Sequence, residues 1–116
     1  MTTATVSIER HDARPVLHVR GEIEFLNSNA VLTDILAAVP PDEPLILDLT
    51  QTTHLDSSGV RVLFTVAERL QDRHQRLVLV ATHEAVLRRV VALTKLDDRV
   101  PLVATVDEAL TTVQQF

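Results

Sequence analysis

The sequence of 116 residues lacks cysteine, tryptophan and tyrosine, and it contains only two glycines and three phenylalanines. Because cysteine is absent, disulfides and thiolate metal sites are excluded, and the chain is compatible with a reducing compartment. The scarcity of aromatic side chains leaves no platform on which nucleic-acid bases could stack. A formal net charge of −5 also disfavours binding to nucleic acid and to anionic membranes.

Long apolar runs are missing as well. No stretch approaches the roughly 18 residues that a membrane span requires, and residues 1–12 lack the basic head and apolar run of a signal peptide. We therefore expect a cytoplasmic protein without a membrane-inserted segment. The composition, 46% hydrophobic and 23% charged, is typical of a soluble globular protein. The length predicts one domain that spans residues 1–116.

What the sequence does contain is a regular succession of strand and helix patterns. Residues 5–8 and 15–20 predict two strands, the second ending at Gly21, and their short link favours an antiparallel pair. Residues 45–49 and 77–81 are almost entirely apolar, as in strands buried on both faces, and residues 101–104 predict a short last strand. Four amphipathic helices are predicted to begin near Asn27 to Asn29, Asp56 to Gly59, Thr82, and Thr105 or Asp107.

This β-β-α-β-α-β-α-β-α order predicts an α/β fold. Its central sheet is mixed and mostly parallel, with one antiparallel edge, and about four helices pack against it. Leu47 and Val78 are expected in adjacent parallel strands of the core. Open sheets of this kind place their sites where the strands end.

A polar turn, Asp56-Ser57-Ser58-Gly59, joins a buried strand to a helix. Asp and Ser favour helix N-caps because their oxygens accept hydrogen bonds from the first-turn N–H groups, and a phosphate is electrostatically favourable at that end. Ser57 is therefore either a plain cap, contributing about 1 kcal/mol, or a modification site as well. We expect its hydroxyl to face outward and Ser58 to be partly screened. Gly59 either lets another backbone segment approach closely, because it has no side chain, or is merely the flexible position of the turn.

Catalytic and metal sites are not predicted. Residues His54, Asp56 and Ser57 lie too close along one loop to act in series as base, orienter and nucleophile, and no Gly-x-Ser-x-Gly elbow is present. We therefore expect no enzymatic activity and no cofactor. Metal binding is also not expected, because none of the histidines pairs with another at helical ligand spacing. The five are His11, His18, His54, His74 and His83.

The predicted order, with Gly21-Glu22-Ile23-Glu24 after the second strand and Leu55-Asp56-Ser57-Ser58-Gly59-Val60 before the second helix, resembles the STAS domain. The stand-alone anti-sigma factor antagonists of bacteria are the most similar branch. In that family a partner serine kinase, which is also the anti-sigma factor, phosphorylates the first serine of the tetrapeptide. The unphosphorylated antagonist binds this kinase and releases the sigma factor.

The resemblance implies phosphorylation at Ser57 and a partner-binding surface around it, formed by Glu24, Asp56, Ser58, Gly59 and Arg61. Two positions depart from the family pattern, which usually has Asp at Glu24 and often a small residue at Arg61. The alternative function is that of a STAS subunit that docks on the ATPase of a lipid-transporting ABC system. A third function, the binding of a small molecule, lacks support because no pocket-forming aromatic residues are evident. The oligomeric state stays open between a monomer and a weak dimer.

Overall fold

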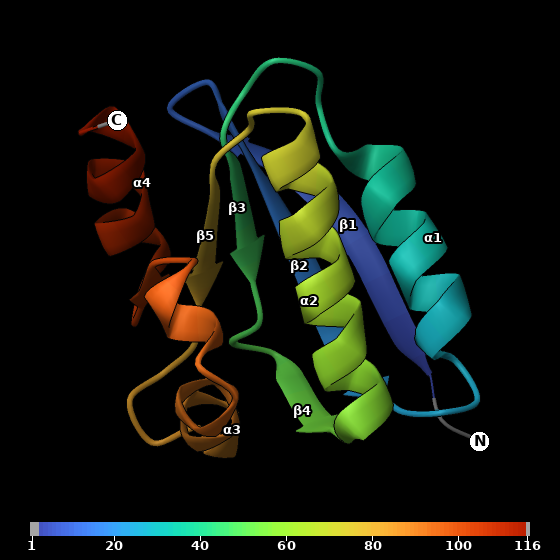
Figure 1. Ribbon diagram of the computed structural model, residues 1–116. Helices are drawn as coiled ribbons and strands as arrows, with labels where there is room; N and C mark the ends of the chain where they lie inside the picture. Colours follow the sequence, from blue (N-terminus) through green and yellow to red (C-terminus); the bar gives the residue numbers. More distant parts are fainter. Residues whose placement is uncertain (1–2, 116) are drawn as a thin grey trace.

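The computed structural model describes residues 3–115 (Figure 1). Its strands and helices follow the predicted alternation, with one additional strand. The strands are β1 Ala4–His11, β2 Arg14–Ile23, β3 Leu45–Asp48, β4 Thr52–Leu55, β5 Leu77–Val80 and β6 Leu102–Val103. The helices are α1 Ser28–Ala38, α2 Ser57–Asp72, α3 Val86–Thr94 and α4 Val106–Gln114, with a short 3₁₀ helix, η1, at Leu96–Asp98.

The strands form one mixed sheet in the order β1-β2-β3-β5-β6, and β4 pairs with β2 beyond the end of β3. Only the β1–β2 hairpin is antiparallel, while the β2–β3, β2–β4, β3–β5 and β5–β6 pairs are parallel. The predicted fold class is therefore confirmed. No helix within residues 3–115 is long and apolar enough to cross a membrane.

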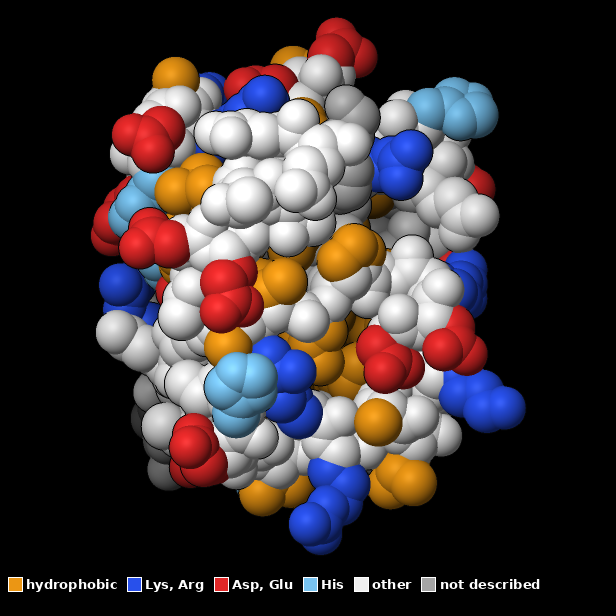
Figure 2. Space-filling model, turned by 90° about the vertical axis from the view of Figure 1, so that its left-hand side faces the viewer, with side chains coloured by type: hydrophobic (Ala, Val, Ile, Leu, Met, Phe, Trp, Pro, Cys, Tyr) orange, Lys and Arg blue, Asp and Glu red, His pale blue; other side chains and the backbone are white. Residues whose placement is uncertain are grey.

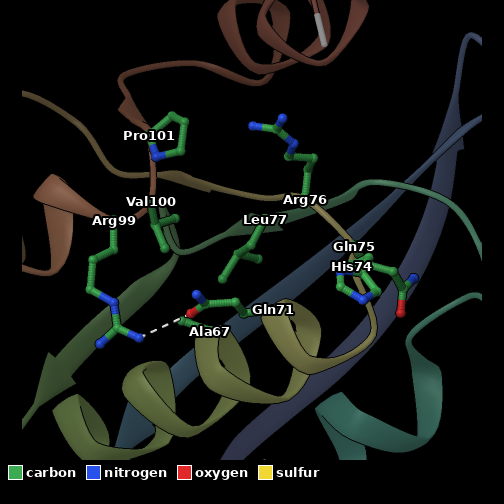
Figure 3. A pocket seen from close by; sticks show the side chains of 9 residues that line it. All are labelled: Ala67, Gln71, His74, Gln75, Arg76, Leu77, Arg99, Val100 and Pro101. Carbon is green, nitrogen blue, oxygen red and sulfur yellow. Dashed lines mark hydrogen bonds between the residues drawn. The ribbon is translucent and has the colours of Figure 1, made fainter.

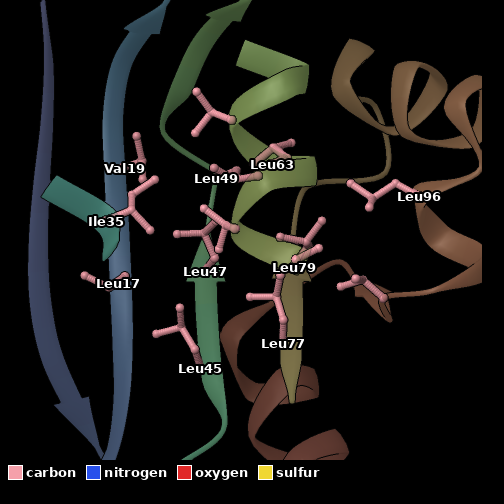
Figure 4. Close-up of a cluster of buried hydrophobic side chains, with 14 of the residues drawn as sticks. Leu17, Val19, Ile35, Leu45, Leu47, Leu49, Leu63, Leu77, Leu79 and Leu96 are labelled. Carbon is pink, nitrogen blue, oxygen red and sulfur yellow. The ribbon is translucent and has the colours of Figure 1, made fainter. Parts of the chain in front are cut away.

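The central strands are buried on both faces because helices cover each face of the sheet. Helices α1 and α2 lie side by side on one face, and α4 lies on the other (Figure 1). Alternate residues therefore enter different cores: Leu45, Leu47 and Leu49 face α1 and α2 (Figure 4), whereas Ile46 packs in the α4 core. Strand β5 behaves in the same way, with Leu77 and Leu79 in the first core and Val78 and Val80 in the second.

Leu47 is at the centre of this arrangement. It is fully buried and lies in register with Leu17 of β2 and Leu79 of β5. Val78 is also fully buried, in the strand next to Leu47. The prediction that these two residues occupy adjacent parallel strands is confirmed.

Strand β2 does not end at Gly21, as the sequence suggested, but continues to Ile23. The register of the β2–β4 pair shifts between Gly21 and Glu22, which marks a bulge. Gly21 has φ +103°, and a Cβ at this position would overlap the carbonyl oxygen of Thr3, so the bulge requires glycine here. Gly21 is thus inside the strand and does not end it.

Strand β4 was not predicted. Thr52, Thr53 and His54 are polar, and the strand is only partly buried, so it lacks the apolar run by which the other central strands were found. Its pairing with the end of β2 leads the chain directly into α2.

The N-cap residues of the helices agree with those predicted from the sequence only in part. Thr105 caps α4, accepting a hydrogen bond from the N–H of Glu108 at 3.1 Å. Thr82 does not cap α3, which begins after Ala85 without a side-chain cap. Asn27 is the N-cap residue of α1, but its side chain bonds to the preceding loop instead of to the first turn.

Candidate functional site

Two loops meet where β2 and β4 end, and Asp56 joins them. The N–H of Asp56 donates to the carbonyl of Ile23 at 3.3 Å, which carries the parallel pairing to the start of α2. Asp56 Oδ2 accepts the N–H of Phe25 from the β2–α1 loop at 3.2 Å. Asp56 Oδ1 accepts the N–H groups of Ser58 and Gly59, at 2.8 and 3.1 Å. One carboxylate therefore both caps α2 and fixes the neighbouring loop.

Ser57 is the first residue of α2, and Asp56, not Ser57, is its N-cap. The expectation that Ser57 acts as the cap is therefore wrong, since the longer Asp side chain reaches the N–H groups that the serine hydroxyl was expected to satisfy. Ser57 is exposed and Ser58 is half-buried, which confirms the expected difference between the two serines. Ser57 is thus at the protein surface, where another protein can contact it.

The β2–α1 loop has a defined conformation. The amide of Asn27 accepts the N–H of Glu24 at 2.9 Å and donates to the carbonyl of Glu22 at 2.7 Å. Glu24 Oε1 in turn accepts the N–H of Leu26 at 3.2 Å. Since the next residue, Phe25, bonds to Asp56, the structure places Glu24 beside the serine loop, as its position after β2 predicted.

Gly59 is buried, and it explains how closely α2 approaches the sheet. A Cβ at this position would lie 2.6 Å from Leu55 Cγ and 3.3 Å from Ile23 Cβ. Of the two explanations for this glycine, the close approach is therefore the right one, although side chains rather than backbone fill the space.

A groove between α1 and α2 opens beside Ser57. Its volume is about 370 Å³, and Phe25 and Leu26 project at its rim with 75% and 83% of their surface exposed. The sequence analysis missed these two residues, although an apolar pair directly before a helix cap was the signal that could have found them. The groove is lined by Phe25, Leu26, Ser28, Asn29, Leu32, Ser58, Arg61, Val62 and Thr65.

Arg61 is exposed at the edge of this groove, four residues after Ser57. Residues at this spacing lie on the same face of a helix. The structure therefore brings the predicted residues Glu24, Asp56, Ser58 and Arg61 around Ser57, while Gly59 lies beneath them in the core.

A larger hollow, of about 490 Å³, lies at the other end of α2 (Figure 3). Its α2 residues are Ala67 and Gln71, so it is roughly 15–20 Å along the helix from Ser57. Arg99 donates to Gln71 Oε1 across it at 3.1 Å. The hollow shares no residue with the groove beside Ser57.

The face that carries α3 and α4 shows acidic and basic side chains interspersed with exposed apolar ones (Figure 2). Val86 and Leu93 of α3 are each 77% exposed. On this face charges of both signs are thus mixed with exposed apolar side chains.

Comparison with known proteins agrees with this architecture. The chain is 31% identical over 107 residues to the anti-sigma-F factor antagonist RsfA of Mycobacterium tuberculosis, covering 90% of this chain and 83% of RsfA. It is 31% identical over 112 residues to RsfB of the same organism, covering 95% and 89%. The crystal structure of an anti-sigma factor antagonist from Mycobacterium paratuberculosis superposes with a TM-score of 0.83 at 35% identity, covering 97% of this chain and 95% of that one. Because residues 5–109 also match the profile of the STAS domain, the chain belongs to the STAS domain family.

Proposed function

We propose that this STAS domain is a non-enzymatic anti-sigma factor antagonist that binds an anti-sigma factor with serine kinase activity and is switched off by phosphorylation at Ser57. The observation that carries the proposal is the exposed hydroxyl at the start of α2, next to an exposed apolar loop. The names of RsfA and RsfB support the same function. In this proposal residues 1–116 act as a single cytoplasmic domain without a cofactor.

The docking surface consists of the groove between α1 and α2 and its apolar rim. Phe25 and Leu26 would bury most of their exposed surface on a partner, and such desolvated anchors dominate binding energy. Glu24 and Arg61 supply one charge of each sign beside them, which would fix the orientation of the partner. Asp56 and Gly59 hold the two loops at the spacing that the surface needs.

The switch follows from the charge of the modification. A phosphoserine carries about −1.5 to −2 charges at pH 7. The N–H groups of Ser58 and Gly59 already bind Asp56, so a phosphate on Ser57 would have to displace a carboxylate to use them. The phosphate would therefore face the partner beside Asp56. A surface shaped for a neutral hydroxyl would have to desolvate this charge, which opposes binding.

Phosphorylation of Ser57 tests the proposal directly. Incubated with its cognate anti-sigma kinase and ATP, the chain should gain one phosphate, which mass spectrometry localises to Ser57. Ser57→Ala should bind the kinase and resist modification. Ser57→Glu should bind at least about tenfold more weakly, a loss of about 1.4 kcal/mol.

Ser58→Ala is the matched control and should still be phosphorylated. Phosphate on Ser58 alone would contradict the assignment of the residue. If no anti-sigma kinase modifies or binds the chain, and a transporter ATPase co-purifies with it instead, the function is that of an ABC transport subunit.

Glu24 is predicted to contact the partner. Glu24→Ala should change the partner affinity or the phosphorylation rate while the free energy of unfolding stays within about 0.5 kcal/mol of wild type. Glu68→Ala is a suitable control, because Glu68 is exposed on the same helix as Ser57 but roughly 16 Å further along it. Normal binding and a normal phosphorylation rate in Glu24→Ala would remove Glu24 from the site.

A further inference from the structure

The face of the β1–β2 hairpin that points away from α1 and α2 carries a cluster of polar side chains. Glu9 and His11 are two residues apart on β1, so they lie on the same face. His18, on β2, pairs with Ser7 of β1 and is therefore the diagonal neighbour of Glu9. On this face the hairpin contributes Val16 to the buried core under α4. The polar cluster therefore lies at the edge of the region that α4 covers.

Three ligand-type atoms converge in this cluster. Glu9 Oε2 lies 3.5 Å from His11 Nε2 and 3.7 Å from His18 Nε2, and all three atoms lie within 4.8 Å of one another. In a tetrahedral zinc site with bonds of 2.0–2.1 Å, ligand atoms are about 3.4 Å apart. The two carboxylate-to-imidazole distances, 3.5 and 3.7 Å, already approach this value.

Asp48 fixes the orientation and the tautomer of His18. Its Oδ2 lies 2.7 Å from His18 Nδ1, while its Oδ1 accepts the N–H of Thr50 at 2.9 Å. A carboxylate accepts hydrogen bonds, so Nδ1 carries a proton, and in the neutral ring the lone pair of Nε2 points into the cluster. A carboxylate behind a histidine in this way is the usual outer-shell partner of a metal ligand.

In the part of the chain that the structure describes, the two imidazole nitrogens that face Glu9 are not satisfied by hydrogen bonds. His11 Nε2 and His18 Nε2 are buried atoms, and neither has a hydrogen-bond partner within residues 3–115. In the neutral imidazole the lone pair of His18 Nε2 faces the carboxylate of Glu9 at 3.7 Å, an unfavourable contact that a positive charge between the two atoms, a proton or a metal ion, relieves. His18 is well packed, with 12% of its side chain exposed, so it does not turn away to relieve this contact.

We propose that Glu9, His11 and His18 bind a divalent zinc ion, with Asp48 positioning His18. Two imidazoles and one carboxylate form a ligand set suited to zinc, whereas magnesium and calcium prefer oxygen ligands alone. Such an ion would join the two strands of the hairpin on the face opposite the partner-binding groove. Histidine spacing along helices did not reveal this set, because its members are neighbours across two strands.

Calorimetry with zinc chloride and the full chain tests the site. Wild type should bind one zinc ion with micromolar affinity at neutral pH. Glu9→Gln and His11→Gln should each weaken binding by at least about tenfold. Both residues are outside the core, so these variants keep the fold, which thermal unfolding without metal verifies. Glu84→Gln and His83→Gln, two exposed residues outside the cluster, are the matched controls and should bind zinc like wild type.

Long-range proton–nitrogen NMR spectra of the imidazoles identify the ligands. Zinc should shift the Nε2 resonances of His11 and His18, while the Nδ1 proton of His18 stays in place. Zinc should also raise the midpoint of thermal unfolding by about 5 °C or more when it saturates the site, and magnesium should have no effect. The proposal is overturned if millimolar zinc does not bind, if the cluster variants bind zinc like wild type, or if only His54, His74 or His83 respond.

Discussion

At Gly59 a single hydrogen atom allows Leu55 and Ile23 to pack under the first turn of α2. Replacing glycine by alanine inside a helix ordinarily stabilises it by about 1 kcal/mol. Here the added methyl group would overlap Leu55, so Gly59→Ala should instead lower the free energy of unfolding by about 1–3 kcal/mol. Urea denaturation of the purified variant measures this difference.

A second substitution identifies the cause. In a Leu55→Ala background the overlap with Leu55 disappears and only the 3.3 Å contact with Ile23 Cβ remains, so Gly59→Ala should then cost much less stability than in wild type. An equal loss in both backgrounds would show that the contact with Leu55 is not what selects glycine at this position.

At the scale of elements, two helices of this chain begin with side-chain caps that differ in one respect. Thr105 caps only α4, whereas Asp56 caps α2 and also binds the N–H of Phe25. Asp56→Ala and Thr105→Ala should each cost about 1–2 kcal/mol of stability. Only Asp56→Ala should also weaken binding to the proposed anti-sigma factor partner, which titration calorimetry measures. A similar loss of binding in both variants would mean that general stability, and not the loop geometry, controls affinity.

The elements also show what the sequence could and could not predict. The apolar strands around Leu47 and Val78 were predictable because burial on both faces leaves a continuous hydrophobic run. Strand β4 was not, since its polar residues are held by pairing with β2 after the bulge at Gly21. Such a pairing depends on a register shift at a distant position in the sequence, which the local pattern of polar and apolar residues does not reveal.

The candidate functional site was also predictable only in part. The position of Ser57 at the start of α2 followed from the polar turn before an amphipathic helix. That Asp56 is the cap depends on which side chain reaches the first-turn N–H groups, and composition does not decide between neighbouring Asp and Ser residues. The cluster of Glu9, His11 and His18 required the hairpin register, which places residues from two strands together.

For the whole molecule, stability depends on a sheet that is covered on both faces. Leu47→Asp would place an unpaired carboxylate among fully buried neighbours and should abolish cooperative unfolding, measured by circular dichroism. Leu47→Ala should cost about 2–5 kcal/mol and keep the fold. Leu93→Asp, at a site that is 77% exposed, is the control and should change stability by no more than about 0.5 kcal/mol. A cooperative Leu47→Asp variant with wild-type thermal stability would contradict the strand assignment.

The pairing of β4 with β2 also has a consequence for the order of folding. The β1–β2 hairpin turns through Asp12 and Ala13, both with positive φ, and hairpins close within about 1–10 μs. Strand β4 pairs in parallel with the far end of β2, and the intervening chain, with α1 and β3, has to cross over for this pairing to form, so we expect it to form later than the hairpin. Asp56 then reaches Phe25 only when this late pairing has formed. We therefore expect a newly made chain to expose Ser57 before the loop of Phe25 and Leu26 is fixed, so that, under the function proposed above, a kinase that requires this surface would not act on unfinished copies.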